Sequence, residues 1–208
     1  MSLTGQPATR QALARQPPAR LILLRHAVAE AGERCAGRGS AFDPGLERPG
    51  REQAAAASRR LGREVDLVVS SPARRALETA AAWDLPVQVD ERLAERSFGE
   101  WEGRRWSELW PTVAAEVLTD PEAYARFTPP GGEPFEEVAA RVQAAMRDLT
   151  AELGRRVLAV THAGPLRLAV AAALDLPPAT ALTLGADHAR AAVLDRHPDR
   201  WILQSLNS

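Results

Sequence analysis

Two apolar runs, each followed by a histidine, constrain the fold of this chain more than any other feature. Leu21–Leu24 leads into Arg25 and His26, and residues 157–161 lead into His162. Short apolar runs bounded by polar and turn-forming residues are typical of buried strands. Histidines this far apart in sequence meet if their strands are parallel neighbours in one sheet. Arg25 and His26 then bring a cation and a neutral nucleophile to one point on the sheet rim, which suits chemistry on a phosphate ester.

The rest of the chain alternates strand-like and helix-like segments. We expect strands at about 20–26, 65–69, 87–89 and 155–161, with final strands at 180–184, 189–195 and 200–205 near a sheet edge. We expect helices at 50–62, from Ser70 to about Trp83 with a serine cap, and at 105–118, 121–126, 135–153 and 164–174. This order predicts an α/β fold, a three-layer α/β/α sandwich with a mostly parallel sheet. Ligands of such sheets bind beyond the carboxyl ends of the strands, where His26 and His162 both fall.

The charged composition excludes several classes of mechanism and partner. All 26 basic residues are arginine, which excludes a Schiff-base lysine and a phosphate-loop lysine, whereas arginine grips phosphate with paired hydrogen bonds. The net charge of -1 offers no basic field for nucleic acid. Cys35 is the one cysteine, so no intramolecular disulfide can form, in keeping with the cytoplasm. Ala41 stands where a cysteine phosphatase would place its arginine, so we do not expect Cys35 to be a nucleophile.

The organisation of the chain is expected to be simple. Residues 1–19 are rich in Gln, Pro, Ala and Arg without an apolar core, and we interpret them as a disordered leader. Residues 20–208 are expected to form one domain. No apolar stretch reaches the 18 residues of a membrane span, so we expect no membrane partner.

Each further candidate residue has an ordinary structural interpretation when taken alone. Arg75 follows Ser70–Ser71–Pro72 and could be an exposed helix residue. Glu95 lies among aromatic residues and could be a solvated charge. Arg38 lies in the Gly-rich loop after His26. His188 and His197 lie near the C-terminal strands, and we expect a surface or structural role for them. The joint occurrence of the other residues in one order is what favours a common site.

That order resembles the histidine phosphatase superfamily, the phosphoglycerate-mutase-like family, from about Leu21 to about Leu174. The family's Arg-His-Gly is matched by Arg25–His26–Ala27, and its second Ser-His-Gly by Thr161–His162–Ala163. Three more of its motifs are matched by Gly50–Ala54, by Ser70–Ala80, which contains Arg75, and by Leu93–Gly103, which contains Glu95. Its Pro-Gly-Gly-Glu segment appears as Pro130–Glu133.

The chain also departs from the family pattern at five positions. Ala27 and Ala163 replace the glycines that usually follow the two histidines. Ala29 and Glu47 stand where threonine or serine is common, and Pro134 where serine is common. None of these changes removes a charged catalytic group, so they bear on the substrate rather than on activity.

The resemblance implies a metal-independent phosphomonoesterase with no cofactor. His26 would attack phosphorus and form a phosphohistidine, while Glu95 would protonate the leaving alcohol and then activate water. Arg25, Arg75 and a protonated His162 would hold the phosphoryl oxygens, with Arg38 as a further candidate. The expected partner is a small-molecule phosphate ester, and an exposed final strand would allow a homodimer.

Two alternatives to hydrolysis stay open. One is a phosphoglycerate mutase, although mutases of the family carry extra segments that shield the phosphoenzyme from water. The other is a non-catalytic phosphoester-binding protein on the same fold. Among phosphatases, the loop 33–38 resembles that of many α-ribazole phosphatases, and the segment 101–133 resembles both that group and broad-specificity phosphatases.

Overall fold

The computed structural model describes residues 17–62 and 64–208, and within them six strands form one sheet. The strand order is β3-β2-β4-β1-β5-β6. The first four strands in this order run parallel, whereas β5 is antiparallel to both β1 and β6. The strands are β1 (Ala19–Arg25), β2 (Leu67–Ser70), β3 (Val87–Val89), β4 (Arg156–Thr161), β5 (Ala191–Arg196) and β6 (Trp201–Ser205).

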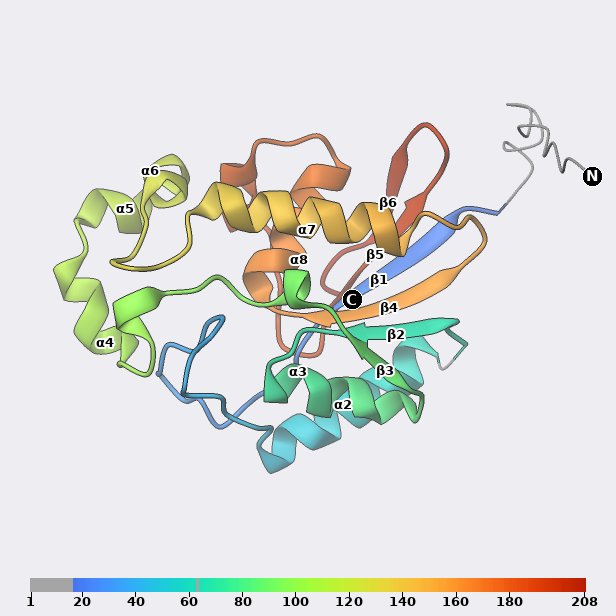
Figure 1. The fold of residues 1–208 in the computed structure, drawn as a ribbon, viewed down its shortest axis with the longest axis horizontal. Helices are drawn as coiled ribbons and strands as arrows, with labels where there is room; N and C mark the ends of the chain where they lie inside the picture. The colour runs from blue at the N-terminus through green and yellow to red at the C-terminus, as the bar shows by residue number, and fades with distance from the viewer. Residues whose placement is uncertain (1–16, 63) are drawn as a thin grey trace, which may run out of the picture.

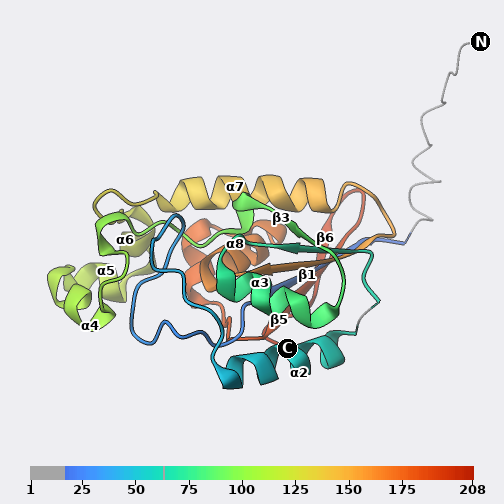
Figure 2. The same ribbon diagram turned by 60° about the horizontal axis from the view of Figure 1, so that its bottom comes forward.

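Helices cover both faces of this sheet, so the predicted three-layer α/β/α fold is confirmed (Figures 1 and 2). The pair α7 and α8 packs on one face, and the pair α2 and α3 packs on the other. Short helices α4, α5 and α6 gather at the end of the molecule opposite the start of β1 (Figure 1). The α-helices are α2 (Arg48–Leu61), α3 (Arg74–Ala80), α4 (Trp106–Leu109), α5 (Ala115–Thr119), α6 (Pro121–Arg126), α7 (Phe135–Leu149) and α8 (Ala163–Ala173).

The core is divided between the two faces by the alternation of side chains along each strand. In β1, Leu21 and Leu23 join the cluster under α7 and α8, whereas Ile22 and Leu24 join the cluster under α2 and α3. A third, smaller cluster of buried residues contains Cys35, Trp101 and Leu109. The predicted leader is largely outside the described residues, but Ala19 is buried and already belongs to β1.

Several predicted elements differ from the structure. The strand predicted at 180–184 is wrong, because this segment forms a 3-10 helix, Pro178–Thr183, that begins with Pro178. The long helix predicted at 105–118 is interrupted by the 3-10 turn Trp110–Thr112, where Pro111 cannot donate a helical hydrogen bond. The helix predicted at 135–153 ends at Leu149, followed by Gly154 at a φ of 83°.

The serine cap predicted at Ser70–Ser71 is also wrong. Helix α3 begins at Arg74 and its N-cap is Ala73. The Ala73 side chain makes no capping hydrogen bond to the helix. The Asp43 carboxylate takes this part instead and accepts the Arg74 N–H at 3.0 Å. An anionic group therefore still caps α3, but it comes from the loop after β1 rather than from the preceding serine.

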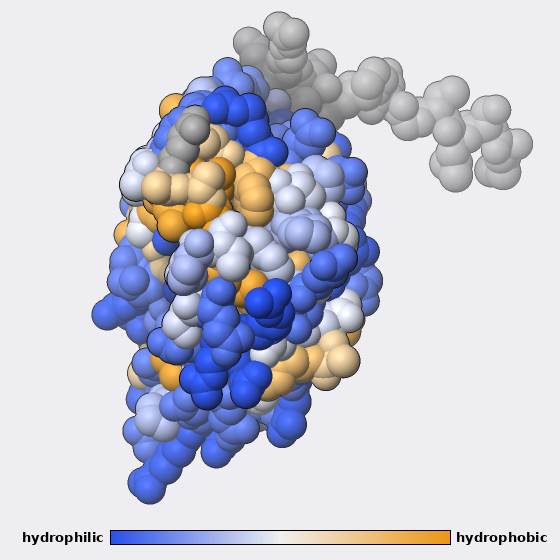
Figure 3. All heavy atoms as spheres, turned by 90° about the vertical axis from the view of Figure 1, so that its left-hand side faces the viewer, coloured by the Kyte–Doolittle hydropathy of each residue, from blue (hydrophilic) through white to orange (hydrophobic). Residues whose placement is uncertain are grey.

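The surface around α4 to α6 is mostly hydrophilic in the space-filling view (Figure 3). A smaller apolar area lies near α5, where 45% of Leu118 is exposed. Within the described residues, the helices are too short or too polar to cross a membrane.

Candidate active site

The two strand-end histidines meet at the carboxyl ends of β1 and β4. These strands are parallel neighbours with Arg25 opposite Thr161, so the next residues, His26 and His162, lie side by side. Their ring centroids are 5.0 Å apart, and both side chains are buried. The sequence prediction that these histidines come together is therefore matched by the geometry.

Arg75 joins the two histidines. Its Nε donates to His26 Nε2 at 3.2 Å, and its Nη2 donates to His162 Nδ1 at 3.1 Å. The same Nη2 donates to the Ala36 carbonyl at 2.8 Å, which ties the loop after β1 to the site. Arg75 is only 4% exposed, so it is a buried cation rather than a surface residue of α3.

The hydrogen bonds fix which ring nitrogen of each histidine carries the proton. Arginine can only donate, so His26 Nε2 and His162 Nδ1 both act as acceptors. His26 Nδ1–H then donates to the Ala27 carbonyl at 2.8 Å, and His162 Nε2–H donates to Ser71 Oγ at 2.8 Å. Each ring is held as a neutral imidazole, with the lone pair of His26 on Nε2.

The electrostatic surroundings favour the same neutral forms. Burial, followed by the charge of Arg75, holds the pKa of His26 well below its usual range. The same two causes, in the same order, hold the pKa of His162 well below its usual range. His162 is thus neutral in this arrangement, and the expected protonated form would need the negative charge of a phosphoryl group beside it.

Arg25 reaches the site together with His188. Its Nη1 donates to the Ala186 carbonyl at 2.6 Å and its Nη2 donates to His188 Nε2 at 2.8 Å. The ring of His188 lies 5.3 Å from that of His26 between centroids. Burial, followed by the charge of Arg25, lowers the pKa of His188 to about 4. The sequence analysis did not place His188 near the site, whereas in the structure it lines the same cavity as His26.

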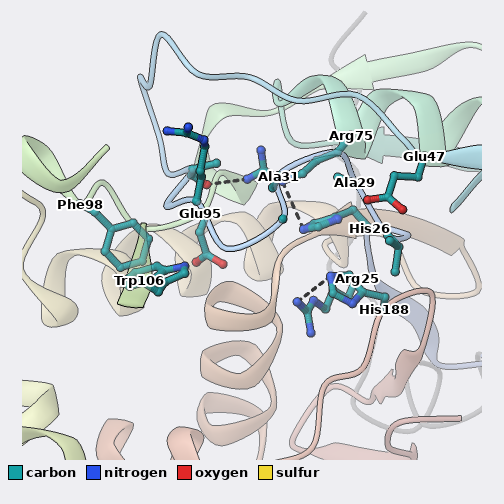
Figure 4. Close-up of a pocket in the computed structure, with 14 residues that line it drawn as sticks. Arg25, His26, Ala29, Ala31, Glu47, Arg75, Glu95, Phe98, Trp106 and His188 are labelled. Carbon is teal, nitrogen blue, oxygen red and sulfur yellow. Dashed lines mark hydrogen bonds between the residues drawn. The ribbon is translucent and has the colours of Figure 1, made fainter. Parts of the chain in front are cut away.

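A cavity of about 360 Å³ opens beside His26 (Figure 4). Arg25, Arg75 and Glu95 also line it, and Phe98 and Trp106 form an aromatic wall. A second cavity of about 230 Å³, lined by His162, shares Arg75 and Glu95 with the first. The predicted residues Arg25, His26, Arg75, Glu95 and His162 are thus gathered around two adjoining spaces.

Arg38 stands apart from this cluster. It lines the second cavity, and 44% of its side chain is exposed. Its Nη1 lies 3.8 Å from Glu133 Oε1, and among the described residues its side chain forms no hydrogen bond with either histidine. Of the predicted phosphate-binding residues, Arg38 is therefore at the rim.

Glu95 is positioned by its own loop and by α7. Its carboxylate accepts the Arg96 N–H at 3.0 Å and lies 3.5 Å from the Gly164 nitrogen in the first turn of α8. Arg141 from α7 donates to the carbonyls of Ala94 and Glu95, at 2.7 and 3.2 Å. A Cβ on Gly164 would approach Glu95 Oε1 to 2.5 Å, so a glycine is needed at this position for the carboxylate to lie there.

Two supporting carboxylates were not singled out by the sequence analysis. Glu102 accepts the N–H groups of Gly37 and Phe98, at 2.7 and 2.8 Å, and so joins the loop after β1 to the loop that carries Glu95. Glu133, from the Pro-Gly-Gly-Glu segment, pairs with Arg141 at 2.7 Å. The motif matches that contain these residues could have indicated them, but only the structure gives their structural roles.

Across the described residues, no three His, Cys, Asp or Glu side chains gather in a way that could hold a metal ion. The cluster around His26 instead combines neutral imidazoles with buried guanidinium groups. Guanidinium groups suit an oxyanion with several equivalent oxygens, and an unprotonated imidazole suits attack on its central atom.

A family model described as histidine phosphatase superfamily, branch 1, matches residues 21–208. The chain belongs to the histidine phosphatase superfamily. The resemblance noted in the sequence is thereby confirmed. The matched range includes all the candidate residues above.

One relative with a longer chain matches most of this sequence. A bifunctional protein of Mycobacterium tuberculosis is 38% identical over 201 residues, which is 89% of this chain and 52% of the relative. The chain therefore spans about half the length of this curated relative.

Solved structures of two phosphatases have the same fold. A mycobacterial glucosyl-3-phosphoglycerate phosphatase has a TM-score of 0.79 at 33% identity, covering 91% of this chain and 98% of the other. The α-ribazole phosphatase of Shigella flexneri has a TM-score of 0.77 at 28% identity, covering 91% of this chain and 96% of the other.

Proposed function

We propose that this member of the superfamily is a metal-independent phosphomonoesterase that acts on a small phosphorylated metabolite through a phosphohistidine at His26. One observation carries the proposal: His26 Nδ1–H is bonded to the Ala27 carbonyl, so the lone pair is on Nε2, beside the buried Arg75. The phosphatase names of relatives in the same superfamily agree with it.

The first half-reaction transfers the phosphoryl group to the protein. Arg75 releases His26 Nε2 and donates to a phosphoryl oxygen, while Arg25 binds another with its Nε–H, which is buried and without a partner among the described residues. His26 Nε2 attacks phosphorus as the bond to the alcohol oxygen breaks. Glu95 supplies the proton that this oxygen takes up, which releases the neutral alcohol.

The second half-reaction returns the free enzyme. Glu95, now a carboxylate, takes a proton from a water molecule that attacks phosphorus. The bond from phosphorus to His26 Nε2 breaks, and inorganic phosphate leaves. Throughout, the phosphoryl charge favours a proton on His162, which then donates to a phosphoryl oxygen beside Arg75.

Turnover of a generic phosphomonoester, with and without EDTA, tests this scheme. We expect activity that EDTA leaves unchanged, and a phosphohistidine trapped by alkaline quench that is absent from His26→Ala. His197→Ala is the matched control, because His197 lies in the turn between β5 and β6, outside both cavities. Full activity in His26→Ala, or turnover that requires a metal, would contradict the proposal.

Phosphoglycerate mutase activity is the alternative within the family. It predicts interconversion of 2- and 3-phosphoglycerate with a bisphosphate primer, whereas a phosphatase releases inorganic phosphate. A substrate panel with α-ribazole phosphate, phosphoglycerates, nucleotides and sugar phosphates separates these activities.

We also propose a cytoplasmic location, supported by the single cysteine, and a homodimer through an exposed edge strand.

A further inference from the structure

The cavity beside His26 contains a carboxylate that the proposed reaction does not use. Glu47 precedes α2 and lines the cavity with His26, and its carboxylate points into the cavity near His26 and Ala29 (Figure 4). The residue is half-buried. Substrate bound for attack by His26 would share this space with the Glu47 carboxylate.

The Glu47 carboxylate is unpaired within the part of the chain that the structure describes. Among the described residues, no hydrogen bond or ion pair to the Glu47 side chain is found, whereas the Glu95 carboxylate accepts the Arg96 N–H. Glu47 is the N-cap of α2, a position at which acidic side chains usually bond the first N–H groups, yet it makes no such bond. Its orientation therefore serves the cavity rather than the helix.

The cations around the cavity are directed elsewhere. Arg75 donates to His26, and Arg25 donates to His188, as described above. Arg34 is exposed, donates to the Gly103 carbonyl at 2.7 Å and lies over the ring of Phe42. The Glu47 charge thus faces the substrate space without direct neutralisation.

We propose that Glu47 is a specificity-determining residue for the alcohol part of the substrate. Its carboxylate accepts hydrogen bonds from hydroxyl groups on the alcohol and repels esters whose alcohol carries a carboxylate. The substrate class is then a carboxylate-free polyol phosphate. This inference rests on the proposed phosphatase function, and it concerns which ester is turned over rather than how.

Glycerol 3-phosphate and 3-phosphoglycerate form a matched pair of probes, because a hydroxymethyl group in the first replaces the carboxylate of the second. We expect the wild type to hydrolyse glycerol 3-phosphate with the higher kcat/KM. In Glu47→Gln the ratio of the two kcat/KM values should fall about tenfold, the size of a like-charge repulsion across a partly solvated cavity. Glu52→Gln removes a charge from the exposed side of α2 and should leave the ratio unchanged.

An unchanged ratio in a folded Glu47→Gln, checked by its thermal midpoint, would overturn the inference while the phosphatase function stands. A wild-type preference for 3-phosphoglycerate that Arg34→Gln removes would also overturn it, since Arg34 would then select the substrate. If no ester is hydrolysed and no phosphohistidine forms, the proposed function itself fails, and this inference fails with it.

Discussion

At the scale of single residues, the chemistry of the site depends on arginines, which donate hydrogen bonds and cannot accept them. Arg75 donates to both neighbouring histidines, and Arg25 donates to His188. Each of these bonds requires an unprotonated nitrogen on the histidine. The site therefore contains three neutral imidazoles beside two guanidinium groups, and the proposed phosphoryl group would accept hydrogen bonds from these arginines.

His188 is expected to be a positioning residue for Arg25. Replacing it by alanine removes the acceptor at 2.8 Å and leaves Arg25 anchored only at the Ala186 carbonyl. We expect His188→Ala to lower kcat/KM about tenfold, mainly through KM, and to weaken inhibition by inorganic phosphate to a similar extent.

His188→Asn keeps a side-chain acceptor and should recover most of this loss. Steady-state kinetics on one phosphomonoester, together with the phosphate inhibition constant, measure both variants. Equal loss in the alanine and asparagine variants would point to packing rather than to the hydrogen bond. Unchanged kinetics in both would show that Arg25 needs no partner there.

The residues that we propose to bind phosphate could be predicted from sequence, and those that support them could not. His26 and His162 each follow the last residue of a predicted strand, so the prediction of parallel strands places them at one edge of the sheet. His188 lies in the segment before an antiparallel strand, outside any matched motif. It reaches the site because β5 pairs with β1, a neighbour relation that no local pattern contains.

At the scale of elements, the position of Glu95, the proposed general acid, depends on two helices that come later in the chain. Arg141 of α7 holds the carbonyls of the segment that carries Glu95, and the first turn of α8 comes within 3.5 Å of its carboxylate. Gly164 leaves the room that this carboxylate occupies. The position of the proposed general acid is therefore a property of helix packing.

Gly164→Ala tests this dependence. The added Cβ would meet Glu95 Oε1 at 2.5 Å, so the carboxylate must move, while alanine in the first turn of α8 is favourable for the helix. We expect kcat to fall about tenfold or more with the thermal midpoint unchanged or slightly raised. A normal kcat would mean that Glu95 acts from a position away from α8, and a large loss of stability would mean that the backbone, not the side chain, yields.

Local patterns predicted most elements but misplaced those that tertiary contacts decide. Strands β1 and β4 could be predicted from their apolar runs because both faces of these strands are buried. Pro111 and Pro178 explain why the segments around them are not a long helix and a strand. The start of α3 was misjudged because its cap is Asp43, which lies 31 positions away in sequence.

At the scale of the whole molecule, the sheet order makes the site a source of pH-dependent stability. Strands β1, β4 and β5 are adjacent, and the residues beyond their ends bring three histidines into a largely buried space. The pKa of each histidine is lowered, first by burial and then by neighbouring cations. The folded state consequently binds fewer protons than the unfolded state below the usual histidine pKa.

Stability should therefore rise with pH from about 4, the pKa of His188, to 6.5, the ordinary histidine value. In that window the unfolded chain is protonated at these sites and the folded chain is not, so acidification favours unfolding. Asp90 and Asp195, whose pKa values are lowered by bonds to arginine, add a further loss only below about their usual value of 3.8.

Thermal unfolding followed by circular dichroism between pH 4.5 and 7 measures this effect. We expect a smaller fall of the midpoint on acidification in His188→Asn than in the wild type, because one of the three groups is removed. His197→Asn, in the β5–β6 turn, should retain the wild-type slope. A midpoint that does not change across this range would contradict the prediction.

Cys35 gives the molecule a single internal reporter. Its thiol is fully buried against Trp101 and Leu109, and burial raises its pKa, so it is unreactive while this packing holds. The same residue pairs through its backbone with Gly103 and Arg104, beside the loops that form the cavity. The rate at which a thiol reagent labels the protein thus measures how often these loops separate, without an introduced probe.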